Sequence, residues 1–547
     1  MFIFKPYYDR FKRNFLSYSS RDSLKKIISS KKLNIVKKPN ILIAGMFAHN
    51  PGLKVETYIA LELIKRGANV SILGCDSALD ACLNCELRYF DNKKDFIENG
   101  PKKNLCGPCT NSTKYQIQSS KLKPFWVSGI TDKNSYKDVD NILENNTYHE
   151  LTKFTENGIN IGEHSVSGTL RFLAKGNINS KCTDDLKVFK RYFKATYIFY
   201  RGFKKLLEQT KFDTIVFHHG IYAQHGIMGD LARAKNIRVV NWNLGYRSQS
   251  LIFSHNDTYH HTLMSESVSV WENISLSEEQ KLKIKNYLKS RQYGNQDWIY
   301  FHGKPKFKSP LLKELQHSSK KKILLLTNVF WDAQLHYPKN IFEDMLEWLL
   351  ETIEFFLEND KYQLIVRVHP AEIRGTVPSN QKMVDEINNR FKTLPENINI
   401  IGPENSISTY SLFQLTDLAV IYGTKTGVEL TAEGIPTIVA GEAWIKNKGL
   451  TYDPVNKKEY FNLLSNIEDI KPMTESQIER ALLYAFHFFF RRMIPVNFIK
   501  HHKYKKFKLE IPLKEINKNN NCDKGLDVIC NGIINGKEFI YPAEKAK

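Results

Sequence analysis

Two short segments carry polar residues suited to binding an anionic ligand. In "RVHPAE" (367–372) an apolar run ends in Arg367 and His369, and the proline that follows fixes the backbone and ends the strand. We expect both side chains to lie at the carboxyl edge of a sheet. The second segment is "GTKTG" (423–427), which lies between the apolar run "LAVIY" and a helical pattern and contains Gly423, Thr424, Lys425, Thr426 and Gly427.

The "GTKTG" segment reads as a turn from a strand into a helix. Unpaired N–H groups at a helix start favour phosphate, glycines allow close backbone approach, and threonine and lysine add donors. Glu429, one turn further on, is a candidate acceptor for ribose or base hydroxyls. The spacing differs from the nucleotide-binding Walker sequence. A purely connecting turn is the alternative interpretation.

The elements that must position these residues form two α/β halves. Alternating apolar strands and amphipathic helices predict doubly wound parallel sheets, which bind ligands at the carboxyl ends of their strands. We expect an α/β fold with two Rossmann-like domains facing a cleft, the GT-B architecture of glycosyltransferases. The expected strands cover 40–47, 68–75, 212–220 and 237–243 in the first half, and 321–330, 362–370, 398–402, 418–423 and 436–441 in the second.

The chain of 547 residues is long enough for two domains and additional segments. The predicted division is a basic tail (1–38), an acceptor domain (39–302) with a Cys-rich insertion at about 75–115, a nucleotide-sugar-binding domain (303–490), and a basic segment (491–547) that returns to the first domain.

Histidines and aspartates gather in the predicted cleft. "FHHGIYAQHG" (217–226) and the segment 246–264 are rich in histidine, and "WDAQLH" (331–336) follows the first strand of the second half. Acid–base catalysis or acceptor contact, metal ligation, and polar packing between domains are all open interpretations. The candidate catalytic residues are His219, Asp257, His261 and Asp332.

Four of the eight cysteines form two C-x-x-C pairs, Cys82 with Cys85 and Cys106 with Cys109. Paired thiols at this spacing suit tetrahedral zinc coordination by four sulfurs, which makes a structural zinc ion the first prediction. An iron–sulfur cluster and unligated reduced thiols are the alternatives. Cys75 is expected to serve packing alone. Because four thiolates would fill the zinc site, we expect no catalytic role for the metal.

The formal net charge is +21, and much of it lies at the chain ends. Residues 1–40 hold eleven Lys or Arg against two acids, and residues 491–508 hold seven and no acid. Basic ends with interleaved aromatic residues suit an anionic membrane surface, although solvated tails are the plainer interpretation. No nucleic-acid-binding motif is present. Without a signal peptide or spanning segment, we expect a cytoplasmic protein peripheral to the inner face of the plasma membrane.

Three segments resemble the capsule polysaccharide biosynthesis family, which includes bacterial Kdo transferases that use CMP-Kdo. They are "RVHPAE", "YGTKTGVELTAEGIPTIVAGEAWIKNKGLTYDP" and "YAFHFFFRRMIP", and the resemblance covers roughly residues 210–500. The first two are also similar to the CMP-holding motifs of bacterial sialyltransferases. The resemblance implies that His369 contacts the donor phosphate and that Thr424 to Thr426 cradle the nucleotide. The family's turn is often serine-rich, whereas this one contains Lys425.

The function expected from this resemblance is glycosyl transfer in bacterial surface-polysaccharide synthesis. The donor would be a nucleotide-sugar, with a CMP-sugar favoured over a UDP-sugar, and the acceptor a lipid-linked glycolipid or growing polysaccharide. The absence of an obvious Asp-x-Asp in the cleft favours catalysis without a metal. A transferase of alcohol phosphate from CDP-glycerol and a non-catalytic, zinc-stabilised membrane scaffold are the alternatives.

Overall fold

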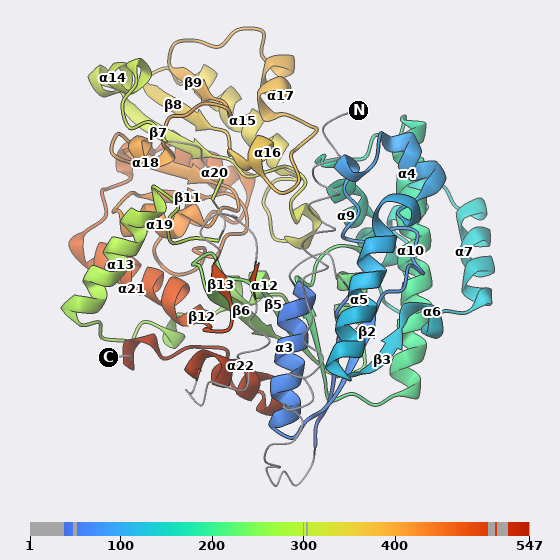
Figure 1. Cartoon of the computed structure of the whole chain (residues 1–547). Coiled ribbons are helices and arrows are strands. Elements are labelled where there is room, and N and C mark those ends of the chain that lie inside the picture. Colours follow the sequence, from blue (N-terminus) through green and yellow to red (C-terminus); the bar gives the residue numbers. More distant parts are fainter. Residues whose placement is uncertain are drawn as a thin grey trace.

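The computed structural model describes residues 38–46, 52–298, 300–301, 305–501, 509–510 and 523–545. The basic tail (1–38), except Lys38, therefore lies outside the described residues, as do the loop 47–51 after the first strand and residues 502–508, 511–522 and 546–547 of the basic segment. Figure 1 shows two α/β halves side by side, the second in yellow and orange and the first mainly in blue and green. Among the described residues, no helix has both the length and the apolar character to cross a membrane.

The first half contains a seven-stranded sheet in the order β12-β6-β5-β4-β1-β2-β3. Five neighbouring strands run parallel, as predicted, but β6 and β12 are antiparallel to their neighbours. The sheet is mixed because five residues join β5 to β6, which is too short for a parallel crossover. Its strands are β1 (Asn40–Ile43), β2 (Asn69–Gly74), β3 (Lys123–Trp126), β4 (Thr214–His218), β5 (Arg238–Leu244), β6 (Ser250–His255) and β12 (Met493–Pro495).

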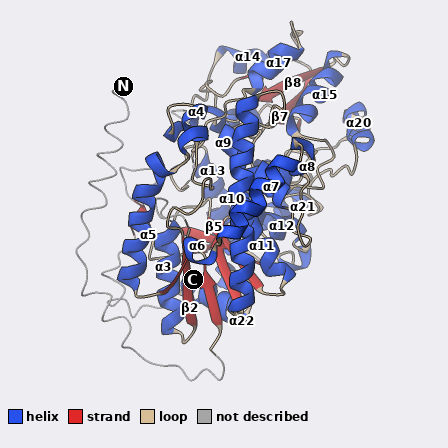
Figure 2. Ribbon diagram, turned by 90° about the vertical axis from the view of Figure 1, so that its right-hand side faces the viewer, coloured by secondary structure: helices blue, strands red, loops and turns tan. Residues whose placement is uncertain are grey.

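Helices cover both faces of the first sheet (Figure 2). Alternate strand residues point to opposite faces, so Ile41 and Ile43 pack with α3 (Gly52–Lys65) and α22 (Lys524–Asn535). Leu42 packs on the other face with α9 (Ile161–Leu173), α10 (Thr183–Gln209) and α11 (Ala223–Ala234). The other helices of this half are α4 (Lys93–Asn99), α5 (Gly107–Ser120), α6 (Val127–Ile130), α7 (Lys133–Asn145), α8 (Tyr148–Thr152) and α12 (Tyr259–Ser265).

The second half contains a fully parallel sheet in the order β11-β10-β7-β8-β9, as predicted. Its strands are β7 (Lys321–Leu326), β8 (Tyr362–Arg367), β9 (Ile398–Ile401), β10 (Leu418–Ile421) and β11 (Thr437–Val439). One face packs on α15 (Met345–Leu357), α17 (Met383–Arg390) and α20 (Lys457–Ser465). The other packs on α13 (Glu278–Arg291), α14 (Pro310–His317), α18 (Thr409–Phe413), α19 (Thr426–Ala432) and α21 (Glu475–Phe486).

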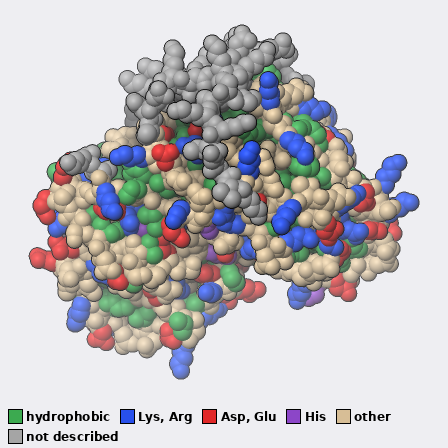
Figure 3. All heavy atoms as spheres, turned by 90° about the horizontal axis from the view of Figure 1, so that it is seen from below, with side chains coloured by type: hydrophobic (Ala, Val, Ile, Leu, Met, Phe, Trp, Pro, Cys, Tyr) green, Lys and Arg blue, Asp and Glu red, His purple; other side chains and the backbone are tan. Residues whose placement is uncertain are grey.

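After the second sheet the chain returns to the first. The aromatic run Phe486 to Phe490 is buried, and β12 then pairs antiparallel with β6. On the face in Figure 3, Lys and Arg side chains are interspersed with Asp and Glu outside the grey atoms, so the part of this face that can be seen has no single basic patch.

Candidate active site

A cavity lies outside the carboxyl ends of β7, β8 and β10 and encloses about 670 Å³, open solvent included. The strand order reverses at β7, which lies between β8 and β10. Such a reversal is where open α/β sheets bind ligands. The lining residues are Arg291, Asp297, Tyr300, Phe301, Leu326, Thr327, Arg367, His369, Pro370, Thr409, Tyr410, Thr424, Lys425 and Thr426. We call this space the second-sheet cavity.

Five of the eight predicted nucleotide-binding residues line this cavity: Arg367, His369, Thr424, Lys425 and Thr426. Gly423, Gly427 and Glu429 are not among the lining residues. A Cβ on Gly427 would lie 2.6 Å from Ile421 Cδ1 and 2.7 Å from Ile445 Cγ2. Packing of α19 on the core therefore already requires this glycine, whether or not a ligand approaches.

His369 is half-buried and its orientation is fixed by backbone hydrogen bonds. Its backbone N–H donates to Thr327 Oγ1 at 3.1 Å, and its ring Nδ1 accepts from the N–H of Ala371 at 3.0 Å. An acceptor at Nδ1 places the ring proton of a neutral imidazole on Nε2. The neutral ring thus carries its proton on Nε2, and the residue lines the cavity.

Arg367 has a structural role that the sequence did not suggest. Its guanidinium donates to the backbone carbonyls of Gly402 at 2.5 Å and Asn405 at 3.1 Å, and the residue is 2% exposed. Burial lowers the pKa of Arg367 to about 10. The side chain therefore holds the loop after β9 in place and adds positive charge to the cavity wall.

An ion-pair network lies beneath the "GTKTG" turn. Glu429 is 2% exposed, and its Oε1 lies 3.1 Å from Lys425 Nζ. Its Oε2 accepts from Tyr410 at 2.6 Å and lies 3.1 Å from Arg291 Nε. Arg291 also pairs with Asp297 at 2.7 Å. Both oxygens of Glu429 thus have protein partners, so its carboxylate positions Lys425 in this structure and does not face the cavity as a ligand acceptor.

Charges within the network set the protonation of its members. Burial alone would raise the pKa of Glu429, but Arg291 and Lys425 outweigh it and lower that pKa to about 2. Burial, aided by the charge of Arg291, lowers the pKa of Lys425. Burial raises the pKa of Asp297, although Arg291 opposes the effect. Three basic side chains, Arg291, Arg367 and Lys425, and one acid, Asp297, thus line the cavity.

The predicted catalytic histidines lie in a second group of side chains, the histidine cluster (His219, His260, His261 and His336). His261 and His336 stack with ring centroids 3.9 Å apart, and those of His219 and His260 are 6.5 Å apart. His336 follows β7, whereas the other three belong to the first half. The cluster therefore joins the two halves of the molecule.

His261 has an acceptor at each ring nitrogen. Nδ1 lies 3.0 Å from Asp257 Oδ2, and Nε2 lies 2.6 Å from the carbonyl oxygen of His336. Burial alone would lower the pKa of His261, but the hydrogen bond and charge of Asp257 outweigh it and raise that pKa. With both nitrogens engaged as donors, His261 fastens the two halves together and is not placed to act as a base.

His219 and His260 are held neutral. Burial, with the charges of neighbouring histidines, lowers the pKa of each well below the ordinary value. The Nδ1 atom of His260 faces the hydroxyl of Tyr337 at 2.6 Å. Within the described ranges, the buried Nδ1 of His219 has no hydrogen-bond partner, and the residue adopts a φ of 69°. A strained backbone and an unpaired buried nitrogen are both features found at functional sites.

Asp332 contacts the first half of the molecule through a hydrogen bond from Tyr222. The Tyr222 hydroxyl donates to Asp332 Oδ1 at 2.7 Å and accepts from the N–H of Ala333 at 2.9 Å. Desolvation by the surrounding protein raises the pKa of Asp332, and the Tyr222 hydrogen bond opposes that rise. The residue nevertheless stays exposed at the protein surface. A carboxylate of raised pKa that solvent can reach is suited to accepting a proton.

Aromatic side chains connect the two groups. Lys425 Nζ lies 5.1 Å from the ring centroid of Tyr246. The Tyr246 ring is 5.7 Å from that of Trp444, which is 5.5 Å from His260. A continuous row of side chains thus runs from the second-sheet cavity to the histidine cluster.

Several of these residues were missed by sequence reasoning. Arg291 lies in a helix with no motif, and His336 and Tyr222 gain their roles only through contacts between the halves. Glu56 is also buried, near the carboxyl end of β1, where Trp242 Nε1 donates to it at 3.0 Å. Burial raises the pKa of Glu56 to about 8. None of these carries a local sequence signal beyond its residue type.

The predicted zinc ligands lie in the first half, in the loop after β2 and at the start of α5. Cys82 Sγ is 3.9 Å from Cys85 Sγ, close to the spacing of about 3.8 Å between two sulfurs that bind one tetrahedral zinc at 2.3 Å. Cys106 and Cys109 line a cavity with Cys82. The thiols therefore suit a soft metal ion, and zinc there stays a prediction.

Among the described residues, one group places at least three ligand atoms within 4.8 Å of one another: Asp257, His261 and His336. Their ligand atoms already make hydrogen bonds, Asp257 with His261 and His336 Nε2 with Thr258 Oγ1 at 2.7 Å. These hydrogen bonds account for the group without a metal ion.

No protein-family model matches the sequence, and no curated protein matches it. Solved structures do show similarity. KpsC of Thermosulfurimonas dismutans, a beta Kdo 2,4 transferase, is 15% identical, with 56% of this chain and 87% of that chain covered and a TM-score of 0.32.

A UDP-GlcNAc 2-epimerase of Methanocaldococcus jannaschii, in complex with UDP-GlcNAc and UDP, is 12% identical, with 82% and 99% covered and a TM-score of 0.26. The spinosyn rhamnosyltransferase SpnG is 11% identical, with 81% and 94% covered and a TM-score of 0.24. Similarities at these low identities and TM-scores do not define the function of this chain.

Proposed function

We propose that this chain is a nucleotide-sugar-dependent glycosyltransferase of surface-polysaccharide synthesis. The observation that carries the proposal is the second-sheet cavity. His369, Thr424, Lys425 and Thr426 come from two strand ends, and they line one space where the strand order of a parallel sheet reverses. Ligands of open α/β sheets bind at this position. The hydrogen-bond donors and the basic side chains that line this cavity suit a phosphate group.

The cavity favours a phosphate-bearing donor, because three basic side chains, Arg291, Arg367 and Lys425, line it. The donor we propose is a CMP-sugar carrying Kdo or a related acidic sugar, in preference to a UDP-sugar, because the His-Pro segment and the "GTKTG" turn resemble CMP-holding motifs. His369 Nε2–H, the hydroxyls of Thr424 and Thr426, and Lys425 Nζ would hold the phosphate.

The same groups would assist bond cleavage. Negative charge develops on the departing nucleotide as the glycosidic bond breaks, and fixed donors at that oxygen stabilise the transition state. Asp332 is the base we assign to the acceptor hydroxyl, because its pKa is raised and solvent reaches it. No step in this scheme uses a metal ion.

We place a lipid-linked glycolipid or growing polysaccharide against the first half, beside the histidine cluster. The basic chain ends would bring the enzyme to the anionic inner face of the plasma membrane, where such acceptors are assembled. A structural zinc ion in the first half, bound apart from this cleft, is part of the same proposal.

Binding of CMP, UDP, GDP and CDP to the purified full-length protein tests the donor assignment. We expect CMP to raise the melting temperature most and to bind with the lowest Kd by calorimetry. Mass spectrometry of products formed from a panel of CMP-sugars and a soluble acceptor then tests transfer. Formation of a glycerol phosphate product from CDP-glycerol, or binding of CMP without turnover of any donor, would contradict the assignment.

A further inference from the structure

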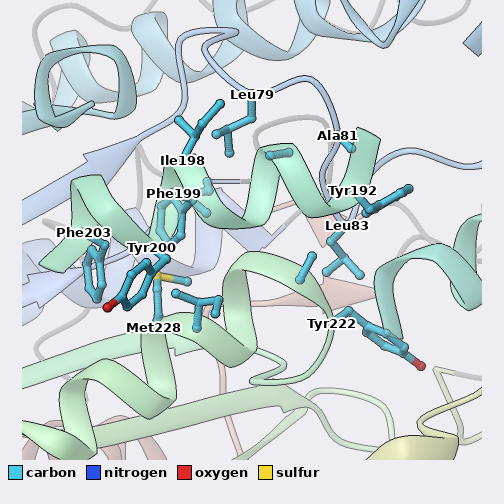
Figure 4. Close-up of a cluster of buried hydrophobic side chains, with 14 of the residues drawn as sticks. Leu79, Ala81, Leu83, Tyr192, Ile198, Phe199, Tyr200, Phe203, Tyr222 and Met228 are labelled. Carbon is cyan, nitrogen blue, oxygen red and sulfur yellow. The ribbon is translucent and has the colours of Figure 1, made fainter. Parts of the chain in front are cut away.

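The loop between β2 and α4 carries cysteines that the cleft does not use. Side chains from α11 and α9 hold this loop in place. Gln224 Nε2 donates to Ala81 O at 3.0 Å, and Arg171 donates to Leu83 O at 2.7 Å. Tyr192 donates to Cys82 O at 3.2 Å. Figure 4 shows Leu79, Ala81 and Leu83 near side chains of α10 and α11, all within one buried cluster.

A cavity beside this loop is lined by four cysteines, which come from three segments of the chain. Cys75 directly follows β2, Cys82 lies in the loop, Cys106 directly precedes α5 and Cys109 lies in the first turn of α5. The remaining lining residues are Met46, Ser77, Leu79, Asn84, Leu105 and Thr110. Four thiols thus meet around one enclosed, largely apolar space.

Cys85 occupies a different position. It is completely buried, belongs to the hydrophobic cluster under the loop, and is not among the residues that line the cavity. Its N–H donates to Cys82 O at 3.0 Å, which turns the chain tightly after Cys82. Its Sγ lies 3.9 Å from Cys82 Sγ, but the Cys85 side chain packs in the core beneath the loop and does not line the cavity.

We propose that Cys75, Cys82, Cys106 and Cys109 bind one zinc ion in this cavity, with Cys75 in the place that the C-x-x-C spacing gives to Cys85. Four thiolates are the ligand set of structural zinc sites. In the described residues no three of these sulfurs lie within 4.8 Å of one another, so the ion must draw them together by a small movement of the loop and α5. Metal sites are seldom fully formed before the metal binds.

The ligand set explains why three distant segments share this cavity. Cys75 extends from the carboxyl end of β2, so zinc would fasten the loop and α5 directly to the first sheet. A site built from Cys82, Cys85, Cys106 and Cys109 would instead fasten the insertion only to itself. The two sets of zinc ligands therefore predict opposite effects on zinc binding when Cys75 or Cys85 is replaced.

Metal content of purified full-length variants decides between them. Wild-type protein expressed with zinc and purified under reducing conditions should contain one zinc per chain. Cys75→Ser, Cys106→Ser and Cys109→Ser should each lower the zinc content at least fivefold. Cys85→Ser should retain it, as should Cys182→Ser, a control at a half-buried cysteine away from the cavity. Loss of zinc in folded Cys85→Ser with retention in Cys75→Ser would overturn the proposal.

Cobalt substitution keeps the test valid if a serine variant misfolds. Co²⁺ added to metal-free wild-type protein should give the charge-transfer and d–d bands of four thiolate ligands. The thiolate charge-transfer absorbance should fall by about a quarter in Cys75→Ala and remain unchanged in Cys85→Ala. A wild-type protein that binds neither Zn²⁺ nor Co²⁺ while its thiols are reduced would equally contradict the site. These readouts do not depend on glycosyltransferase activity, so they stand apart from the proposed function.

Discussion

Arg291 at the end of α13 lies 3.1 Å from the carboxylate of Glu429 in α19, and both side chains are almost fully buried. The two residues are far apart in the sequence, yet their pairing fixes the floor of the second-sheet cavity. Lys425 shares the same carboxylate, which holds its ammonium group toward Tyr246. The positions of Arg291 and Lys425 in the cavity wall therefore depend on Glu429, a buried acid that does not line the cavity.

Replacing that acid should destabilise the protein. Glu429→Gln leaves Arg291 and Lys425 without their shared counter-charge, and loss of one partner of a buried pair costs about 3–5 kcal/mol. Urea denaturation at pH 7 measures the loss. Glu433→Gln is the control, because Glu433 is exposed at the end of the same helix. Equal stability of both variants would show that the network contributes nothing to folding.

Glu429 should also make stability depend on pH. Its folded pKa of about 2 lies below the ordinary 4.5, so its contribution is complete above about pH 4.5 and is lost as pH falls toward 2. The difference corresponds to on the order of 3 kcal/mol. Denaturation of wild type and Glu429→Gln from pH 6 to pH 3 should show a steeper decline in wild type. Parallel declines would contradict the lowered pKa.

Lys425→Met should weaken nucleotide binding while preserving the fold. The change keeps an apolar stem on Tyr246 and removes a charge-assisted hydrogen bond worth about 1.5–3 kcal/mol, so the Kd for CMP should rise roughly tenfold to a hundredfold. His369→Ala should act in the same direction. Lys457→Met is the matched control, since Lys457 pairs with Glu347 and Glu351 away from the cavity. An unchanged Kd in both cavity variants would remove the phosphate-binding assignment.

Asp332→Asn tests the proposed base. We expect kcat to fall by about 10²–10⁴, the usual contribution of general base catalysis, while the Kd for CMP changes less than twofold. Wild-type kcat/KM should rise with pH as Asp332 ionises. Because the Tyr222 hydrogen bond lowers the pKa of Asp332, Tyr222→Phe should move this acidic limb to higher pH. An acidic limb that stays in place in Tyr222→Phe would assign the titration to another group.

The pair of His261 and Asp257 should favour the folded protein at mildly acidic pH. The folded pKa of His261 is raised, so its contribution is complete below the unfolded value of about 6.5 and is lost as pH rises through the folded pKa. Melting temperatures between pH 6 and pH 9 should decline less in His261→Asn than in wild type. His317→Asn, at an exposed position, serves as control. Equal slopes in all three proteins would contradict the charged form of His261.

The basic chain ends should bind anionic vesicles in a salt-dependent manner. The net charge of +9 in residues 1–40 attracts an anionic surface, and the attraction falls as salt rises. Deleting residues 1–38 should reduce co-sedimentation with phosphatidylserine-containing vesicles and leave transfer to a soluble acceptor intact. Equal binding to neutral vesicles at low salt would leave the tail as a solvated extension.

The sequence predicted those elements of the fold and of the site that depend on residues close together in the chain. The strand ends at His369 and at the "GTKTG" turn were predicted because apolar runs stop there, and both line the second-sheet cavity. The strand β6 was not predicted, because its short apolar run lies within the histidine-rich segment 246–264. The partners of Glu429 and His261 were also missed, because Arg291 and His336 reach them only after the two halves pack.

The pairing of β12 with β6 has a consequence for biosynthesis. Residues 493–495 complete a sheet whose other strands end at His255, so more than two hundred residues are synthesised in between. Until residues 493–495 have left the ribosome, the outer edge of β6 remains unpaired. Unpaired strand edges promote aggregation. Expression of the first half alone, or truncation before Met493, should therefore yield insoluble protein, whereas co-expression of the missing carboxyl-terminal piece should restore solubility.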